Sequence, residues 1–168
     1  DASSPDGTAA AVRSHFPEVH LISASEDTYW GRGMARAASD APPQAAYHLW
    51  LNDDVALYPE AVLRLLRTAV DHLQDHREPV VVGHLEDRSG RTSYAGFRRS
   101  GRPLSFVHVP KSDDAQECDT VNGNVVLVPH AIYERHGSVD PSFPHAMGDI
   151  DFGLRVRAAG DPGRAASA

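Results

Sequence analysis

The sequence contains one cysteine, no long apolar run and a deficit of positive charge. The single Cys118 excludes an internal disulfide bond and a cysteine-based zinc site, so a reducing cytoplasmic environment is expected. The longest apolar runs, 80–82 and 125–128, are far shorter than the roughly 20 residues of a membrane-spanning helix. A formal net charge of −7 argues against a nucleic-acid partner. Residues 1–7 are polar and show no signal peptide, and a first residue other than Met is consistent with processing or a fragment.

Length and composition suit one globular domain in which strand-like and helix-like segments alternate. The 168 residues, 41% of them hydrophobic, are enough to bury a substantial core. Continuous apolar strands that alternate with helices predict an α/β fold with a mostly parallel sheet covered on both faces. The predicted strands are 19–22, 46–51, 79–82 and 120–128, and the predicted helices are 7–16, 31–40, one opened by Pro59, 131–136 and 149–159.

The helix opened by Pro59 has the clearest pattern, because proline suits a first helical position and apolar residues recur at helical spacing. Between residues 83 and 119 glycine, arginine and serine are frequent, which predicts short strands and a polar loop at 111–117. The predicted buried positions of the helix are Val62, Leu65, Leu66, Ala69, Val70 and Leu73.

The first candidate site is Asn52-Asp53-Asp54, which directly follows an apolar strand. Unpaired carboxylates are costly to bury, so these side chains must face water or a cation. Hard oxygen ligands at a strand end suit Mg²⁺ or Mn²⁺ that holds a diphosphate. The alternative interpretation is a polar turn that leads into the next helix.

The second candidate site is the segment 144–155. Asp149 lies at a predicted helix start, where it either caps the helix or acts as a general base toward a hydroxyl. Asp151 lies two residues later and would point elsewhere, so we expect the two acids to have different roles. His145 is either a metal or phosphate ligand or an ordinary surface histidine.

Three weaker signals lie elsewhere in the chain. Residues 1–8 read as a turn followed by a helix cap. Trp30 and Gly31 precede a helix and would either hold a sugar or phosphate or pack into the core. Asn122-Gly123-Asn124 interrupts a predicted strand, which indicates a bulge or a close approach to a ligand.

The order of these motifs resembles the bacterial family-2 glycosyltransferases, which have the GT-A fold. The resemblance covers nearly the whole chain and is carried by DASSPDGT, YWGRGMARAA, YHLWLNDDV and TVNGNVVLVPHAIYERHGSVDPSFPHAMGDIDFGLRVRAAG. It implies one Rossmann-like domain over residues 1–168, with a nucleotide-binding half at about 1–58 and an acceptor and catalytic half at about 83–160. No Q-x-x-R-W signature is present, which argues against a processive polysaccharide synthase.

The resemblance implies a role for each candidate residue except His145. Asp54 would bind the divalent cation that bridges the nucleotide diphosphate, and Asp149 would be the general base. His145 is predicted as a second metal ligand from its residue type and not from the resemblance. Asn52 stands where the family often has Asp, and Gly148 stands where it often has Glu. The implied donor-binding residues are Asp1, Trp30, Gly31, Asn52 and Asp53, and the implied acceptor or supporting residues are Asn124, Asp151 and Arg155.

The chain departs from the family at both ends. The family's first strand and helix would precede Asp1, and the family usually continues after Gly160 with another strand and helices, whereas this chain ends at Ala168. The resemblance therefore implies a member that is truncated at both ends.

The expected reaction is the transfer of a sugar from a nucleotide-sugar to an acceptor hydroxyl, with inversion and with Mg²⁺ or Mn²⁺ as cofactor. By family analogy the acceptor is a surface polysaccharide or a glycolipid. The expected location is therefore the cytoplasm, including peripheral association with the inner face of the membrane. Two alternatives stay open: a metal-dependent nucleotidyltransferase, and a non-catalytic remnant that binds carbohydrate or a partner.

Overall fold

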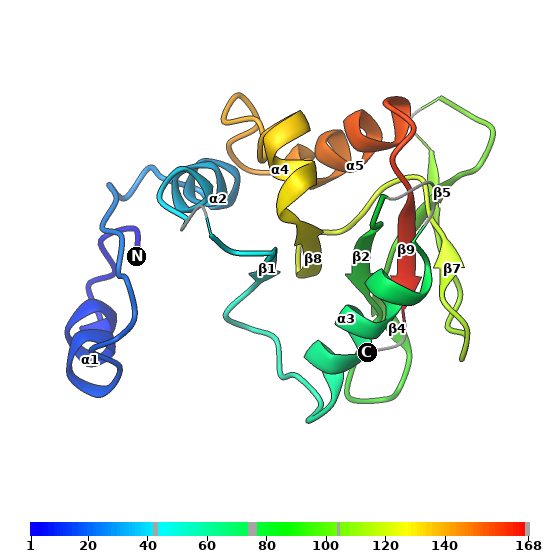
Figure 1. Ribbon diagram of the computed structural model, residues 1–168. Helices are drawn as coiled ribbons and strands as arrows, with labels where there is room; N and C mark the ends of the chain where they lie inside the picture. The colour runs from blue at the N-terminus through cyan, green and yellow to red at the C-terminus, as the bar shows by residue number, and fades with distance from the viewer. Residues whose placement is uncertain (42–43, 74–76, 104, 167–168) are drawn as a thin grey trace. The chain divides into compact units, whose positions relative to one another are not determined.

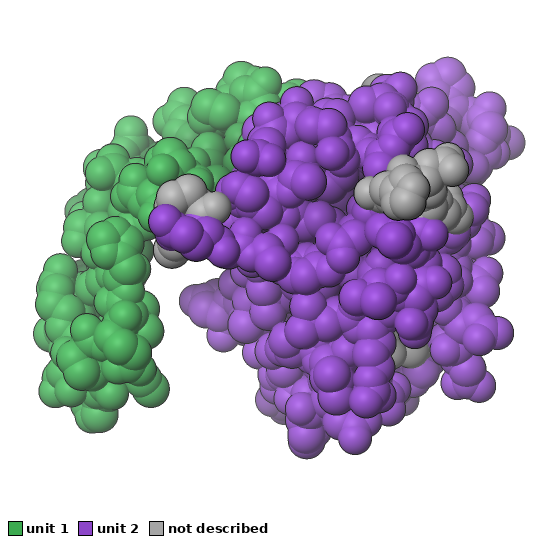
Figure 2. All heavy atoms as spheres, in the orientation of Figure 1, with its two compact units in different colours: residues 1–42, 138–148 green, residues 43–137, 149–168 purple. Residues whose placement is uncertain are grey.

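The computed structural model describes residues 1–41, 44–73, 77–103 and 105–166. The chain divides into two compact units, which Figure 2 colours separately. Unit 1 comprises residues 1–42 and 138–148, and unit 2 comprises residues 43–137 and 149–168. The predicted division into a nucleotide-binding half and an acceptor half stays a prediction.

The helices and strands of both units follow one another as Figure 1 labels them. The helices are α1 Thr8–His15, α2 Trp30–Ser39, α3 Ala61–Asp71, α4 His130–His136 and α5 Gly148–Ala158. The strands are β1 Tyr47–Leu51, β2 Val80–Gly83, β3 Leu85–Glu86, β4 Thr92–Tyr94, β5 Phe97–Arg99, β6 Phe106–His108, β7 Gln116–Glu117, β8 Val125–Pro129 and β9 Gly163–Ala166.

The prediction of a mostly parallel, Rossmann-like sheet is wrong. The described strands form one five-stranded sheet in the order β1-β8-β2-β9-β7, together with the small antiparallel pairs β3-β4 and β5-β6. In the large sheet only β2 and β9 are parallel, while β8 is antiparallel to both of its neighbours and β7 is antiparallel to β9. The fold is therefore a mixed α+β arrangement.

The prediction fails because a continuous apolar strand indicates burial on both faces and does not indicate whether the neighbouring strands are parallel or antiparallel. All five residues of β8 are buried, although both adjacent strands run against it. On one face, Leu65 and Ala69 of α3 pack with Val81 and Leu127. Successive side chains of a strand point to opposite faces, and Trp50 of β1 contacts the ring of Phe152 in α5.

Several element boundaries also differ from the predictions. Residues 19–22 form no strand, because this apolar run is largely exposed, with Val19 at 50%, and makes no ladder. The predicted strand 120–128 begins only at Val125, because the residues before it bond to other segments. The helix after Pro59 begins at Ala61, and β9 was not predicted.

The predictions for the other helices are confirmed to within one or two residues at each end. The helix 149–159 is α5, which stops before Gly160, a glycine with φ of 83° that ends the helix in a left-handed conformation. In α3 the helical spacing is correct but the buried stripe is narrower than predicted. Leu65 and Ala69 are buried, whereas Val62 and Val70 are exposed.

The length of the helices bears on the predicted location. Within the part of the chain that the structure describes, no helix combines the length and the apolar character that a membrane crossing requires. The exact location stays a prediction.

Candidate functional site

A cleft of about 780 Å³ in unit 2 lies beside the segment that follows β1. Asp54 and residues 55–58 line one part of it, residues 83–88 line another, and Asn124 lies at the start of β8. A second pocket of about 450 Å³ shares three of its lining residues, Tyr58, His84 and Glu86, so the two cavities adjoin. Asp54 thus lies at a cavity large enough for a small-molecule ligand.

A network of hydrogen bonds joins the end of β1 to the loop before β8. The backbone N–H of Asn52 donates to the carbonyl oxygen of Asn124 at 3.0 Å, and the Asn52 side-chain amide donates to Oδ1 of Asn124 at 2.5 Å. The backbone N–H and side-chain amide of Asn124 both donate to Oδ1 of Asn122. Asn52 therefore fixes Asn124, which lines the cleft.

The same loop holds Asp149 at the start of α5. The backbone N–H of Gly123 donates to Oδ2 of Asp149 at 2.8 Å, and the N–H of Ile150 donates to Oδ1 at 2.8 Å. Each carboxylate oxygen has two lone pairs, so these bonds orient the half-buried group and leave acceptor capacity. Asn52, Asn124 and Asp149 came from three separate motifs, and the structure brings them into one network.

Asp151 has different surroundings from Asp149. Nε of Arg155 donates to Oδ2 of Asp151 at 2.8 Å, and a second guanidinium nitrogen donates to the carbonyl oxygen of His136 at 2.6 Å. His136 ends α4, so the Asp151–Arg155 pair ties α5 to the end of that helix. Asp151 and Arg155 thus hold α5 against the end of α4.

The carboxylates of Asp53 and Asp54 are exposed to solvent, and Asp54 lines the cleft. An exposed carboxylate remains charged without a desolvation cost. Magnesium is commonly held by one or two carboxylates together with substrate phosphates and water. The donor chemistry of Asp54 therefore fits a divalent cation that arrives with a diphosphate.

The remaining candidates lie in unit 1. Gly31 is in the first turn of α2, and its N–H donates to the carbonyl oxygen of Pro144 at 3.0 Å. A Cβ at Gly31 would lie 2.0 Å from the carbonyl oxygen of Phe143, so only glycine permits this approach. The ring of the exposed His145 contacts Tyr29 at 3.7 Å between centroids. Segments 29–31 and 143–145, which were predicted separately, thus lie side by side.

Asp1 lies apart from that contact, within the same unit. It lines a hollow of about 310 Å³ that also includes Thr28, Gly33 and Arg36. Its α-amino group donates to the carbonyl oxygen of Ile22, and its own carbonyl oxygen accepts from the backbone N–H of Ala24. Its predicted contact with a nucleotide stays a prediction.

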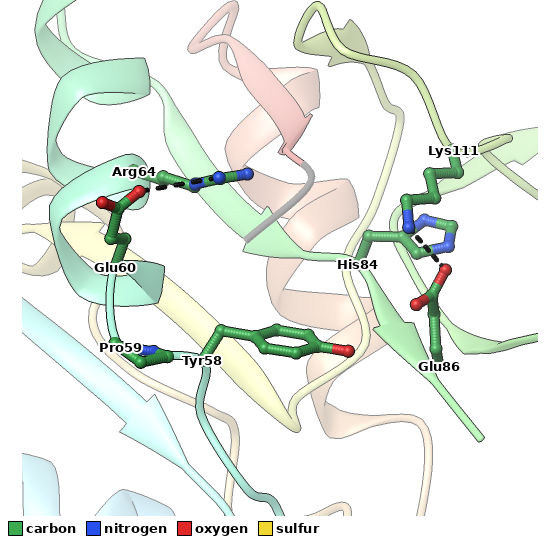
Figure 3. A pocket seen from close by; sticks show the side chains of 7 residues that line it. All are labelled: Tyr58, Pro59, Glu60, Arg64, His84, Glu86 and Lys111. Atoms are coloured by element: carbon green, nitrogen blue, oxygen red, sulfur yellow. Dashed lines mark hydrogen bonds and ion pairs between the residues drawn. The ribbon is translucent and has the colours of Figure 1, made fainter. Parts of the chain in front are cut away.

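Sequence reasoning missed the polar residues where the cleft adjoins the second pocket. His84 follows the buried β2, has 9% of its surface exposed, and its Nε2 lies 3.0 Å from Oγ1 of Thr92. Nζ of Lys111 donates to Oε1 of Glu86 at 2.6 Å, which raises the pKa of Lys111 (Figure 3). The sequence does contain a signal for His84, because this polar residue directly follows the apolar run VVVG, as Asn52 follows the apolar strand before it.

Burial lowers the pKa of His84 below its ordinary 6.5, the charges of Lys111 and His108 act in the same direction, and Glu86 opposes them. His84 therefore binds a proton more readily in the unfolded chain than in the folded chain. Its contribution to the free energy of unfolding is fully present above about pH 6.5 and is lost as the pH falls below that value. We expect the unfolding temperature of the wild type to fall between about pH 7 and pH 5. The unfolding temperature of the His84→Gln variant should fall less steeply over the same range. Thermal unfolding across this range measures both slopes, and identical slopes would contradict the assignment to His84.

The structure therefore gathers Asn52, Asn124 and Asp149 in one network of unit 2, with Asp54 on the cleft that Asn124 also lines. The roles of these residues in binding and catalysis stay predictions. No model of a known protein family matches the chain, and a search of curated proteins finds no match.

Proposed function

We propose that the chain transfers a sugar from a nucleotide-sugar donor to an acceptor hydroxyl, with inversion at the anomeric carbon. One observation carries the proposal: the loop 122–124 connects the cleft to Asp149. Asn124 of this loop lines the same cleft as Asp54, and the backbone N–H of Gly123 donates to the Asp149 carboxylate. The reaction requires two groups: a charged group that binds the metal–diphosphate, and a carboxylate that accepts the proton of the acceptor hydroxyl.

The Asp54 side of the cleft would bind the donor. A Mg²⁺ or Mn²⁺ ion held by Asp54 and the donor's phosphates would neutralise the charge that develops on the departing diphosphate. Asn52 keeps the strand end in place through two hydrogen bonds to Asn124, and the exposed Asp53 is available to the donor's ribose or phosphates. Asp1, Trp30, Gly31 and His145 lie in unit 1, and their contact with a donor or a metal stays a prediction from the sequence.

Asp149 would accept the proton of the acceptor hydroxyl. As the proton leaves, the acceptor oxygen forms a bond to the anomeric carbon, and the bond from that carbon to the diphosphate oxygen breaks. A single displacement of this kind inverts the configuration at the carbon. The N–H groups of Gly123 and Ile150 fix the carboxylate, so little reorganisation is needed when it takes the proton.

The acceptor and the location follow from the same proposal. A cleft of about 780 Å³ is within the usual range for small-molecule sites and has room for a donor and part of a saccharide. We propose a surface polysaccharide or glycolipid acceptor, with the reaction in the cytoplasm or at the inner face of the membrane.

The donor half of the proposal predicts that Asp54→Ala abolishes the metal-dependent binding of a nucleoside diphosphate. Because Asp54 is exposed, its loss should change the free energy of unfolding by less than about 0.5 kcal/mol. Isothermal titration with uridine and guanosine diphosphates, with Mn²⁺ and then with EDTA, measures the effect. Asp71→Ala, an exposed aspartate at the end of α3, is the matched control. Equal affinities in the wild type and Asp54→Ala, with and without EDTA, would refute a metal role for Asp54.

A further inference from the structure

The pocket of about 450 Å³ that adjoins the cleft contains none of the residues assigned to the reaction. It is formed by the segment before α3, the first turns of α3, the end of β2 with β3, and Lys111. Figure 3 shows the side chains that reach into it. They are Tyr58, Glu60, Arg64, His84, Glu86 and Lys111.

The charges in this pocket cancel in pairs. Lys111 bonds to Glu86 at 2.6 Å, and Arg64 lies 3.6 Å from Glu60. These two pairs lie on different sides of the pocket in Figure 3. Each cation thus has its own carboxylate, and the buried His84 favours the neutral form. The pocket therefore has little attraction for a phosphate or an acidic group.

The same side chains are rich in hydrogen-bonding capacity. An ammonium group has three donors, and each ionised carboxylate accepts at both oxygens, so each pair retains groups for a ligand. Donors and acceptors that stand next to each other suit hydroxyl groups, because a hydroxyl both donates and accepts. An uncharged ligand with many hydroxyls satisfies this arrangement better than an anion or an apolar molecule does.

Tyr58 provides the apolar surface of the pocket. Its side chain is 65% exposed, although a tyrosine ring gains from burial, and in Figure 3 it extends across the pocket between the two ion pairs. A flat aromatic face bordered by polar groups matches the two kinds of surface on a pyranose ring, which has C–H groups on its faces and hydroxyls at its edge.

We propose that this pocket binds an uncharged hexose unit of the acceptor saccharide, with the sugar ring on Tyr58 and its hydroxyls on the Lys111–Glu86 and Arg64–Glu60 pairs. The role as acceptor rests on the proposed glycosyl transfer, while the binding of a neutral hexose rests on the pocket alone. The shared residues His84, Glu86 and Tyr58 would place this unit next to the cleft.

The test is an NMR titration of the isotope-labelled chain without nucleotide or metal. The probes are the methyl glycosides of glucose, galactose and mannose, the matching methyl hexuronides, and the nucleosides uridine and adenosine. We expect a neutral hexoside to shift the resonances of Tyr58, His84 and Lys111 and to bind more tightly than its hexuronide. Tyr58→Ala should weaken that binding by about two- to tenfold, the range for an aromatic contact. Phe16→Ala, which removes an exposed aromatic ring of unit 1, should leave it unchanged.

A second variant tests the cancellation of charge. Glu86→Gln preserves the shape of the side chain and leaves the Lys111 ammonium without its carboxylate. The ratio of hexuronide to hexoside affinity should then rise about tenfold, because the ammonium can pair with the sugar carboxylate. An unchanged ratio would overturn the assigned role of the pair.

The outcomes separate this inference from the proposed function. Asp54→Ala should bind the hexoside as the wild type does, because Asp54 does not line this pocket. Absence of any hexoside shift, preference of the wild type for hexuronides, or binding of the nucleosides in place of hexosides would overturn the inference and leave the metal–diphosphate test standing. Hexoside binding without metal-dependent diphosphate binding would support the pocket and overturn glycosyl transfer.

Discussion

Replacing Asp149 with asparagine should reduce the rate of sugar transfer by about 10²–10⁴-fold, the usual contribution of a general base. The substitution removes the proton acceptor but keeps the shape of the side chain. The amide oxygen of asparagine can still accept the hydrogen bond that Gly123 now donates to Oδ2. The side-chain NH2 of asparagine cannot accept from the N–H of Ile150, so the variant loses that one hydrogen bond, at a cost of about 1–3 kcal/mol in the free energy of unfolding. The bond from Gly123 still ties the loop 122–124 to the start of α5. The measurement is the initial transfer rate at saturating donor, together with the unfolding temperature of the variant.

Asp151→Asn is the matched control for Asp149. It weakens the ion pair with Arg155, which ties α5 to the carbonyl of His136, and it leaves the Asp149 contacts intact. We expect a modest loss of stability and a much smaller effect on the rate. If Asp149→Asn retains near-wild-type activity, or loses activity only because it unfolds, the carboxylate is a structural group of the helix start and the base lies elsewhere.

Phe152→Ala should lower the free energy of unfolding by about 3–5 kcal/mol, the usual cost of removing a buried phenylalanine ring. Phe152 is completely buried, with its ring 4.8 Å from that of Trp50 in β1 and 6.5 Å from that of Tyr133 in α4. It therefore joins α5 to β1 and α4, and it lies three residues after Asp149. For a chain of this length the loss corresponds to a decrease of about 6–20 °C in the unfolding temperature.

The comparison for Phe152 is Phe16→Ala. The Phe16 side chain is 55% exposed, so its loss should change the free energy of unfolding by less than about 0.5 kcal/mol. Denaturant unfolding of both variants gives the two values. Equal effects of the two substitutions would show that the ring cluster around Phe152 does not hold α5 on the sheet.

The sequence predicts the helices better than the sheet, because helix signals are local. Helical spacing of apolar residues locates α3, and the left-handed Gly160 ends α5 as expected. Strand direction is decided by partners that are distant in the sequence, and no local pattern distinguishes VVLV in an antiparallel strand from the same residues in a parallel one. For that reason the burial of β8 was predicted correctly and its orientation was not.

The candidate site shows the same division between local and distant information. A polar group at a strand end is a local signal, and it located Asn52 and Asp54. Asn124 was located by another local signal, the interruption of an apolar run by polar residues. The hydrogen bond from Gly123 to Asp149 joins residues 26 positions apart in the sequence. The contact of Gly31 with Pro144 joins the two stretches of sequence that make up unit 1, residues 1–42 and 138–148. Lys111 was read as part of a polar loop, because nothing near it in the sequence indicates its partner Glu86.

The most direct test of the proposed reaction is the identity of the phosphorus-containing product. The 168-residue chain is incubated with nucleotide-sugars, Mn²⁺ and a mixture of methyl hexosides, with Asp54→Ala and Asp149→Asn in parallel. Phosphorus-31 NMR follows the nucleotide products, and proton NMR follows the disaccharide. Sugar transfer predicts release of a nucleoside diphosphate and formation of a disaccharide by the wild type, with both signals lost or strongly reduced in the two variants. Release of a sugar 1-phosphate, which reports cleavage between the two phosphates, or a nucleoside diphosphate signal that is equal in all three proteins, would contradict glycosyl transfer at this site.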